Sequence, residues 1–309
     1  MKRFFPTLII FLLLFGYMWA QEAIPEHRIS LRQLVERADS GDPKALYDLA
    51  YLHDIGYDSI QVDSLLSTAL YKKSAEKGYA PAMNFLGFRY YKGEKINKNI
   101  DSALFWIRKA ADVGDITAAA NLGYLLTESD EIPHDENEAV KWLTIAAEHG
   151  VNEAQLKLID LKGETFRNLD ADSALIIGTE YYVGKAPILG TFILEGAAEA
   201  GIPKAQALLG DAYSKGLGVP YDHQKAIDFY YEAARGGDPS AQFVIAELLE
   251  IFPDALNNLN IKTTEFETPA IEPRQSDTDI HTPSYWYEKA AAQGVTDSET
   301  ATRSLLSIP

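Results

Sequence analysis

A five-residue pattern of small and polar positions recurs along this chain. It consists of two small residues, two variable residues and a glycine, as in Ala110–Gly114 and Ala146–Gly150. The glycines that close the box, the first of them in a weaker copy, are Gly41, Gly78, Gly114, Gly150, Gly201, Gly237 and Gly294. Their spacings are 37, 36, 36, 51, 36 and 57 residues. A nearly fixed period of this length predicts a repeat protein built from stacked helical units.

The residues around each glycine keep the same phase and predict two helices in every repeat. Alanine stands four residues after the glycine in six copies, Leu or Ile stands eight residues after it, and the ninth position is small in five of six copies. These positions share one face of a first helix. A large aromatic residue eight positions before the glycine belongs to a second helix, which the glycine ends. The aromatic residues are Trp106, Trp142, Phe229 and Trp286. We therefore predict an all-α protein, an α/α superhelical solenoid of about six to seven helix pairs.

Two intervals between glycines are longer than the 36-residue period. The first holds 15 extra residues, and within it Ile177–Gly184 repeats the first-helix pattern at an unexpected phase. We place an insertion at about 164–185, as either a third helix or an extension of one unit. The second interval holds 21 extra residues, and four prolines in the segment 252–283 predict a long, mobile loop.

The repeats account for residues 31–300, which leaves a short lead at 21–30 and a C-terminal tail at 301–309. The last glycine, Gly294, is not followed by alanine at the fourth position. We therefore expect the segment 295–309 to be a capping helix or a frayed end.

Several segments resemble Sel1-like repeats, a family within the tetratricopeptide-like superfamily. Leu86–Gly93 (LGFRYYKG) and Leu209–Val219 (LGDAYSKGLGV) look like the first helix of such a repeat. Lys225–Tyr230, followed by the small-residue box that ends at Gly237, looks like the second. The resemblance covers about residues 30–300 and implies an α/α superhelix that works as a protein–protein adaptor. In such superhelices the first helices line the concave face.

The N-terminal segment has the order of a secretory signal sequence. Lys2 and Arg3 precede an apolar run that ends at Trp19, and a small residue, Ala20, follows. We predict a signal peptide over 1–20 and an exported protein, periplasmic or extracellular. The run is shorter than the roughly 20 residues that a spanning helix requires. The alternative is an uncleaved anchor at residues 4–20, in the inner membrane.

The net charge and the cysteine content argue against several classes of function. The chain has 28 basic and 45 acidic residues, a formal net charge of −17. Binding to nucleic acid or to an anionic lipid surface needs positive charge, so we expect neither partner. The absence of cysteine excludes disulfides, thiolate nucleophiles and zinc sites built on cysteine.

A search for catalytic patterns finds no complete one. Ser74–Lys77 matches the S-x-x-K motif of penicillin-recognising enzymes, but it fills a repeat box and has no partner motif. The histidines lack metal-ligand spacing, and Asn168–Asp172 lacks the glycine and glutamate of a calcium loop. Asp160 and Asp211 are the one candidate pair of convergent acids. We therefore predict no catalytic residue, no cofactor and no metal site.

Residues that vary between repeats are the best candidates for contacts with a partner. The position ten residues after each glycine lies just beyond the small packing residue, and we expect it to lie off the buried stripe. It is occupied by Tyr51, Phe88, Tyr124, Asp160, Asp211 and Glu247. Three positions further on, Tyr91 adds another aromatic ring. The hypothesis is a groove with an aromatic N-terminal half and an acidic C-terminal half. The alternative is that the rings pack between neighbouring first helices.

These patterns favour one function and leave two others open. The favoured function is an exported, monomeric scaffold that binds a protein or peptide segment, with basic residues in the partner facing the acidic half. The second is a cell-envelope hydrolase, or a peptidoglycan- or β-lactam-binding protein of the Sel1-like type. The third is a membrane-tethered adaptor that keeps its N-terminal anchor.

Overall fold

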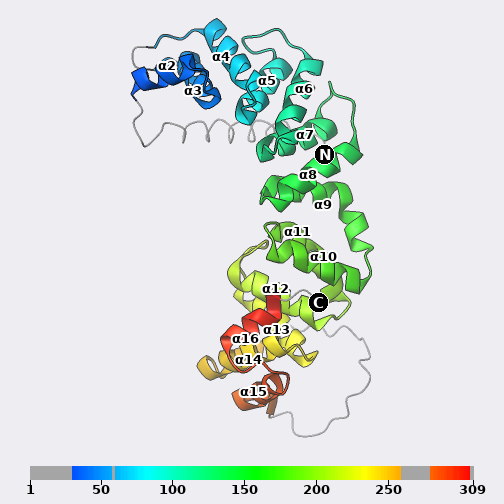
Figure 1. The fold of residues 1–309 in the computed structure, drawn as a ribbon. Helices are drawn as coiled ribbons and strands as arrows, with labels where there is room; N and C mark the ends of the chain where they lie inside the picture. Colours follow the sequence, from blue (N-terminus) through cyan, green and yellow to red (C-terminus); the bar gives the residue numbers. More distant parts are fainter. Residues whose placement is uncertain (1–29, 58–59, 259–278, 307–309) are drawn as a thin grey trace. The chain divides into compact units, whose positions relative to one another are not determined.

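The computed structural model describes residues 30–57, 60–258 and 279–306 (Figure 1). Fifteen α-helices follow one another in these ranges, which contain no β-strand. The prediction of an all-α repeat fold is confirmed. The predicted signal sequence lies outside the described residues.

The helices form two compact units, residues 1–149 and residues 150–309. In the first unit, the two helices of each pair pack along each other, and each second helix packs on the first helix of the next pair. A single helix, α2 (Leu31–Asp39), packs on the first of these pairs. The pairs are α3 (Pro43–Ile55) with α4 (Ser64–Glu76), α5 (Ala80–Lys92) with α6 (Ile100–Asp112), and α7 (Ile116–Glu128) with α8 (Glu136–Glu148).

The repeat glycine makes the turn from one pair to the next. Gly78 and Gly114 have φ angles of 93° and 92°, a left-handed conformation that glycine adopts without steric cost. At three of these turns the residue after the glycine is an aspartate that caps the next helix: Asp42, Asp115 and Asp238. Asp115 accepts a hydrogen bond from the backbone N–H of Ala118 at 2.7 Å. The sequence box therefore encodes both the end of one helix and the start of the next.

Small residues let the two helices of a pair approach closely. A Cβ atom at Gly87 of α5 would lie 2.5 Å from Ile107 of α6, and one at Gly123 of α7 would lie 2.5 Å from Leu143 of α8. Ser74 occupies one small position of the box. It is fully buried, and its hydroxyl donates to the Pro43 carbonyl at 2.6 Å. This serine is thus part of the packing between the two helices of one repeat, in agreement with its place in the sequence pattern.

The second unit contains two helices, α9 and α16, in addition to three pairs. It begins with α9 (Asn152–Arg167), which packs on α11. Three pairs and a final helix follow. They are α10 (Ala171–Val183) with α11 (Pro187–Glu199), α12 (Pro203–Lys215) with α13 (His223–Arg235), α14 (Pro239–Ile251) with α15 (Pro283–Ala291), and α16 (Ser298–Leu306).

The segment predicted as an insertion at 164–185 is the end of α9 and the whole of α10. Gly178 of α10 faces Leu194 of α11 in the way that Gly210 of α12 faces Tyr230 of α13. Helix α10 therefore takes the role of a first helix, paired with α11. The added element is α9, which has the first-helix sequence pattern without a second helix of its own.

The structure describes only part of the C-terminal region of the chain. Of the predicted loop at 252–283, residues 259–278 lie outside the described residues. Two short 3-10 helices flank them, η1 (Ala255–Asn258) and η2 (Asp279–His281). Residues 301–306 of the predicted tail belong to α16, so the capping-helix alternative is the one observed. None of the described helices is both long and apolar enough to cross a membrane.

Candidate interaction surface

The first unit carries a cluster of aromatic rings from α3, α4 and the N-terminal part of α5. The ring of Tyr47 on α3 meets Tyr71, Tyr79 and Phe85 edge-on, with centroids 5.2, 5.4 and 6.3 Å away. Tyr71 on α4 is fully buried, while Tyr47, Tyr79 and Phe85 are half-buried. Burial raises the pKa of Tyr47 and Tyr79 above the ordinary value. The aromatic content of this region comes from four residues that the position rule did not select.

Three predicted aromatic residues occupy two different environments. Tyr51 on α3 and Phe88 on α5 are half-buried, as expected for residues at the edge of a packed face. Tyr124 on α7 is only 4% exposed. The expectation that this position lies off the buried stripe is wrong for Tyr124. Helix α7 is buried over Ala118–Leu126, since it packs on α6 and α8 and also touches α5.

Tyr91 connects two repeats of the first unit. Its hydroxyl lies 3.0 Å from the Ser129 hydroxyl, at the end of α7. The Lys98 ammonium lies 5.9 Å from the Tyr91 ring centroid and forms an ion pair with Glu131 at 2.6 Å. The half-buried Tyr91 side chain therefore already has protein partners on both its ring and its hydroxyl.

A charged cluster fixes the first two repeats to each other. Asp54 on α3 accepts hydrogen bonds from Arg89 on α5, from Lys95 at 2.9 Å and from the Ser67 hydroxyl at 2.8 Å. Burial acts to raise the pKa of the Asp54 carboxyl, but these donors hold it below its usual value. The Arg89 guanidinium, 5% exposed, also lies 4.9 Å from the centroid of the Tyr71 ring. This cluster holds the aromatic rings in place.

Carboxylates near the aromatic cluster are desolvated. Burial raises the pKa of Asp48, whose carboxyl accepts from Lys44 at 2.7 Å. Burial also raises the pKa of Asp115, the N-cap residue of α7. The first-helix face of this unit therefore combines rings with partly desolvated negative charge, which attracts cationic groups.

Two predicted acids of the second unit, Asp211 and Asp160, differ in exposure and in their partners. Asp211 on α12 is 5% exposed; its carboxyl accepts from the Tyr182 hydroxyl and from Lys215, both at 2.7 Å. The expected position off the buried stripe is therefore wrong for Asp211. Helix α10 supplies Tyr182 as a partner, which the sequence spacing did not reveal. Asp160 on α9 is exposed and pairs with Lys157 at 3.1 Å. The two acids thus have separate partners.

Glu247 on α14 lies on an exposed acidic surface. Partial burial and the neighbouring Glu250 carboxylate raise the pKa of Glu247. Glu250 accepts a hydrogen bond from the Tyr287 hydroxyl at 3.1 Å, and burial together with this contact raises the pKa of Tyr287 to about 12. Glu247 and Glu250 are therefore the predicted acidic half as the structure presents it.

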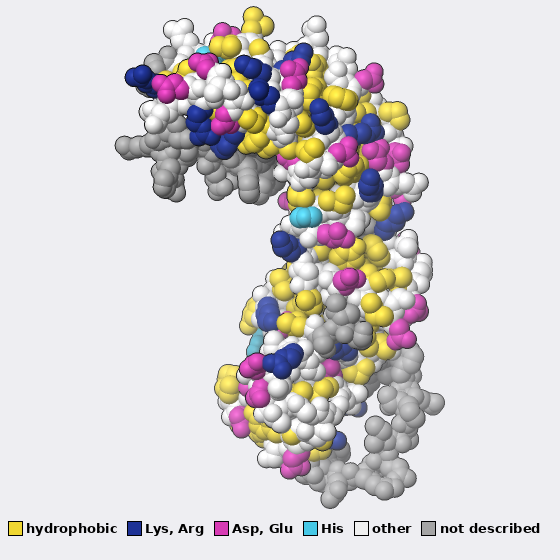
Figure 2. Space-filling view, in the orientation of Figure 1, with side chains coloured by type: hydrophobic (Ala, Val, Ile, Leu, Met, Phe, Trp, Pro, Cys, Tyr) yellow, Lys and Arg dark blue, Asp and Glu magenta, His cyan; other side chains and the backbone are white. Residues whose placement is uncertain are grey.

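Charge is unevenly divided between the two halves of the sequence. Residues 150–309 contain 24 acidic and 12 basic residues, whereas residues 30–149 contain 19 and 13. On the visible face in Figure 2, acidic, basic and hydrophobic side chains are interspersed. Within the described ranges, no group of His, Asp and Glu side chains could hold a metal ion.

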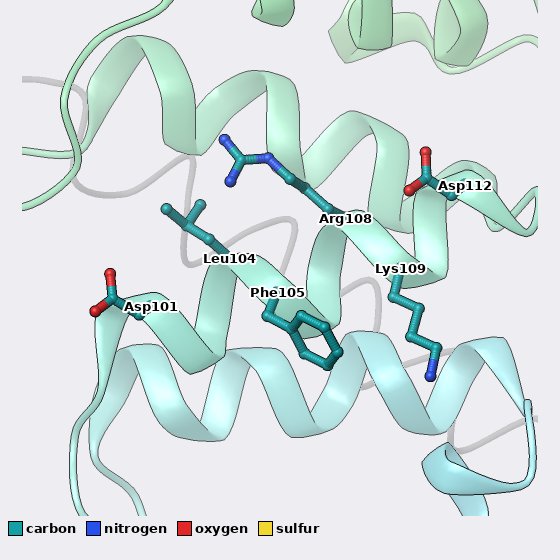
Figure 3. A pocket seen from close by; sticks show the side chains of 6 residues that line it. All are labelled: Asp101, Leu104, Phe105, Arg108, Lys109 and Asp112. Carbon is teal, nitrogen blue, oxygen red and sulfur yellow. The ribbon is translucent and has the colours of Figure 1, made fainter.

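A shallow hollow lies on the outer face of α6 in the first unit (Figure 3). Phe105 is 56% exposed there, and the Lys109 ammonium lies 5.8 Å from the centroid of its ring. Arg108, also in the lining, is held by Glu138 of α8 through two hydrogen bonds of 2.9 Å. The hollow is lined by one helix, and it is a solvent-exposed aromatic site on the side of the second helices.

Comparison with known proteins places the repeats in a family. A model of the Sel1 repeat matches residues 43–79, 80–115, 116–151, 203–238 and 285–295. The matched residues make up about half of the chain and leave out the region of α9, α10 and α11. The family model therefore matches the pairs α3–α4, α5–α6, α7–α8 and α12–α13 together with α15, and it omits α14 as well as the irregular segment.

Curated relatives cover different shares of the chain. An uncharacterised protein of Neisseria meningitidis is 27% identical over 250 residues, which are 76% of this chain and 49% of the relative. A chitin synthase regulator of the fungus Malassezia restricta is 27% identical over 186 residues, 47% of this chain and 13% of the regulator. The chain thus spans about half the length of the first relative and a small part of the second.

A solved structure with a related fold is a protective antigen of uropathogenic Escherichia coli. It is 26% identical, with a TM-score of 0.41, over 90% of this chain and 59% of the antigen. The family assignment rests on the matched Sel1 model, and the helix pairs and glycine turns agree with it. The chain belongs to the Sel1 repeat family.

Proposed function

We propose that this protein is an exported, non-catalytic scaffold that binds a segment of a partner protein across the first helices of its N-terminal unit. Sel1 repeat proteins generally mediate protein–protein interactions, and their scaffolds are generally non-enzymatic. The contact surface in this proposal is formed by Tyr47, Tyr51 and Phe88, on α3 and α5. We call it the aromatic face.

The observation that carries this proposal is the partial exposure of rings on successive first helices. Tyr47, Tyr51 and Phe88 are half-buried, so each has exposed surface beside a fixed packing contact. Rings held in this way lose little conformational entropy on binding, and aromatic residues are frequent binding hot spots. The Asp48 carboxyl beside them is paired with Lys44 at 2.7 Å, so the aromatic face offers mainly ring surface to the partner segment.

The acidic contribution of the second unit is assigned to Glu247 and Glu250. Asp211 already accepts from Lys215 and Tyr182, so its charge is compensated within the protein. Glu247 and Glu250 are exposed, and their mutual repulsion would be relieved by a basic partner. We therefore retain a partner with Lys or Arg as part of the proposal and remove Asp211 from the contact set.

Export and the absence of catalysis rest on different observations. The order of residues in 1–20 supports export. Of the alternatives, a hydrolase would require convergent acids, and Asp160 and Asp211 have separate basic partners. Two curated relatives, of Malassezia restricta and Saccharomyces cerevisiae, are named chitin synthase regulators. Their names support an adaptor more than an enzyme.

The test is a comparison of two phenylalanine substitutions in the chain 21–309. Immobilised wild-type protein, Phe88→Ala and Phe105→Ala would each be exposed to an envelope extract at moderate salt, and retained proteins identified by mass spectrometry. Circular dichroism would first establish that all three fold. We expect a partner that is held by wild type and by Phe105→Ala, and is reduced at least tenfold on Phe88→Ala.

The Phe105→Ala control tests which side of the first unit contacts the partner protein. Phe105 is exposed on a second helix, whereas Phe88 lies on a first helix. A partner lost from Phe105→Ala and kept by Phe88→Ala would move the site to the hollow on α6. Retention of the same proteins by all three columns would contradict a role for the aromatic face.

A further inference from the structure

The last helix of the chain packs differently from the first helices that precede it. In a regular first helix, the positions four, eight and nine residues after the repeat glycine are buried, as Ala205, Leu209 and Gly210 are in α12. In α16 the same positions are Ser298, Thr302 and Arg303, and all three are exposed. The buried residues of α16 are instead Ala301 and Leu305, one helical turn apart. Helix α16 therefore uses another face for packing.

The surface under α16 is the first-helix face of the second unit. Helix α16 contacts both α14 and α12, which belong to successive pairs. The Lys204 ammonium on α12 donates to the carbonyl of Ser304, in the last turn of α16. Ala301 packs in one cluster with Phe243 of α14. The helix thus bridges two first helices through one polar and one apolar contact.

Three equivalent positions of the first unit are more open, although a fourth, Ala120, is buried. Lys44 and Thr117, three residues after their glycines, are exposed, and Tyr47, six residues after its glycine, is half-buried. In the second unit the corresponding Ser240 and Phe243 are 1% and 7% exposed. The same face is therefore partly open in one unit and closed in the other, where α16 lies.

The contacts of α16 indicate which kind of helix binds to the first-helix face of α12 and α14. Ala301 and Leu305 form an apolar stripe with i, i+4 spacing on a helix whose remaining side chains are mostly polar. Lys204 lies at the C-terminal end of α16, where the helix dipole favours a cation. Asp297 fixes the other end, since its carboxyl accepts from the Thr300 N–H at 2.8 Å. An amphipathic helix seated in a groove is a common mode of peptide recognition.

We infer that the first-helix face of α12 and α14 is a helix-binding groove, and that α16 is its intramolecular occupant, displaced by a partner helix with a small residue and a leucine at i, i+4. Displacement removes the contacts that Phe243 and Lys204 make with α16. This inference goes beyond the aromatic face, because it concerns the second unit and a helical partner. Its failure would leave the comparison of Phe88→Ala with Phe105→Ala unaffected.

The probe is a labelled synthetic peptide of residues 295–309 added to the full mature chain. In Leu305→Glu the charge opposes docking of α16, whereas Thr302→Glu places the same charge on the exposed face of the helix. By fluorescence anisotropy we expect Leu305→Glu to bind the peptide at least tenfold more tightly than wild type or Thr302→Glu, in which the tethered helix competes. Adding Lys204→Glu to Leu305→Glu should remove this binding. Equal affinity for wild type and Leu305→Glu, or no binding by Leu305→Glu, would overturn the inference.

A second measurement needs no substitution and therefore does not depend on the folding of a variant. Hydrogen exchange of the wild-type backbone would be followed by mass spectrometry with and without excess peptide carrying heavy isotopes, so that peptide and protein fragments differ in mass. We expect exchange in residues 298–306 of the protein to accelerate at least fivefold when the peptide is present. Unchanged exchange at a saturating peptide concentration would show that α16 is a fixed part of the fold.

Discussion

Two carboxylates of the first unit respond to burial in opposite ways. Asp54 receives hydrogen bonds from Arg89, Lys95 and Ser67, and its pKa falls below the usual value in spite of burial. Asp115 receives mainly backbone N–H groups, and burial raises its pKa. A carboxylate paired with a buried guanidinium is thus stabilised in its charged form, whereas a capping carboxylate without a cation is not.

The first prediction concerns the buried guanidinium. Arg89→Leu should lower the free energy of unfolding by about 3 kcal/mol at pH 7, because it leaves Asp54 partly buried with fewer donors. Arg108→Leu, which removes a more exposed pair with Glu138, should cost about 1 kcal/mol or less. Urea unfolding followed by circular dichroism measures both. Equal costs for the two variants would contradict the role assigned to the Asp54 cluster.

The pH dependence of this effect has a defined sign. The pKa of Asp54 in the folded state lies below its unfolded value of about 3.9. The stabilisation is therefore complete above about pH 4 and is lost as the pH falls through the folded-state pKa. The difference between wild type and Arg89→Leu should accordingly shrink in acid.

A second prediction concerns the capping carboxylate. Asp115→Asn keeps an acceptor for the Ala118 N–H and removes a desolvated charge, so it should raise the free energy of unfolding at pH 7 by up to about 1 kcal/mol. The raised folded-state pKa means that wild type gains this stability itself as it binds a proton in acid. The difference in the free energy of unfolding between Asp115→Asn and wild type should therefore disappear at low pH. Asp135→Asn, at the exposed N-cap of α8, is the matched control and should change little. A loss of stability in Asp115→Asn would contradict this account.

Side-chain environments were harder to predict than helix positions. The rule that selected Tyr124 and Asp211 counts residues from the glycine, and this count cannot register that α7 is buried along most of its length. The partner of Asp211, Tyr182, lies on α10, outside the regular repeat. Both differences arise from contacts with other helices, which a count along one helix does not include.

At the level of elements, the close approach of α10 and α11 gives a third prediction. A Cβ atom at Gly190 would overlap the backbone of Tyr182, whereas one at Gly196, on the same helix, meets no atom within 4 Å. Gly190→Ala should therefore lower the thermal midpoint by several degrees. Gly196→Ala should raise stability by about 0.5–1 kcal/mol through helix propensity. Differential scanning calorimetry of the two variants is the measurement, and equal midpoints would show that α10 and α11 are not in close contact.

The sequence period predicted the regular pairs because each pair needs the same small and large residues at the same offsets. It also detected a copy of the first-helix pattern at Ile177–Gly184, which is part of α10. It did not determine that α9 would stand without a second helix. A sequence pattern identifies a helix with a buried face. The number of helices between two glycines depends also on which apolar helix faces still need a neighbouring helix to pack against.

For the whole molecule, the N-terminal segment gives a fourth prediction. If residues 1–20 are a signal peptide, native protein purified from the exporting cell should begin at Gln21. Intact mass spectrometry measures this directly, with allowance for cyclisation of the N-terminal glutamine. A mass that includes residues 1–20 in protein recovered from membranes would instead support the tethered adaptor.

The central claim is that a partner occupies the first-helix side of the protein. The most direct measurement is hydrogen exchange of the full mature chain with and without the partner retained by wild type and lost by Phe88→Ala. The account predicts slower exchange in α3 and α5, with α6 and its exposed Phe105 unchanged. Protection confined to the second helices α4, α6 and α8 would contradict it.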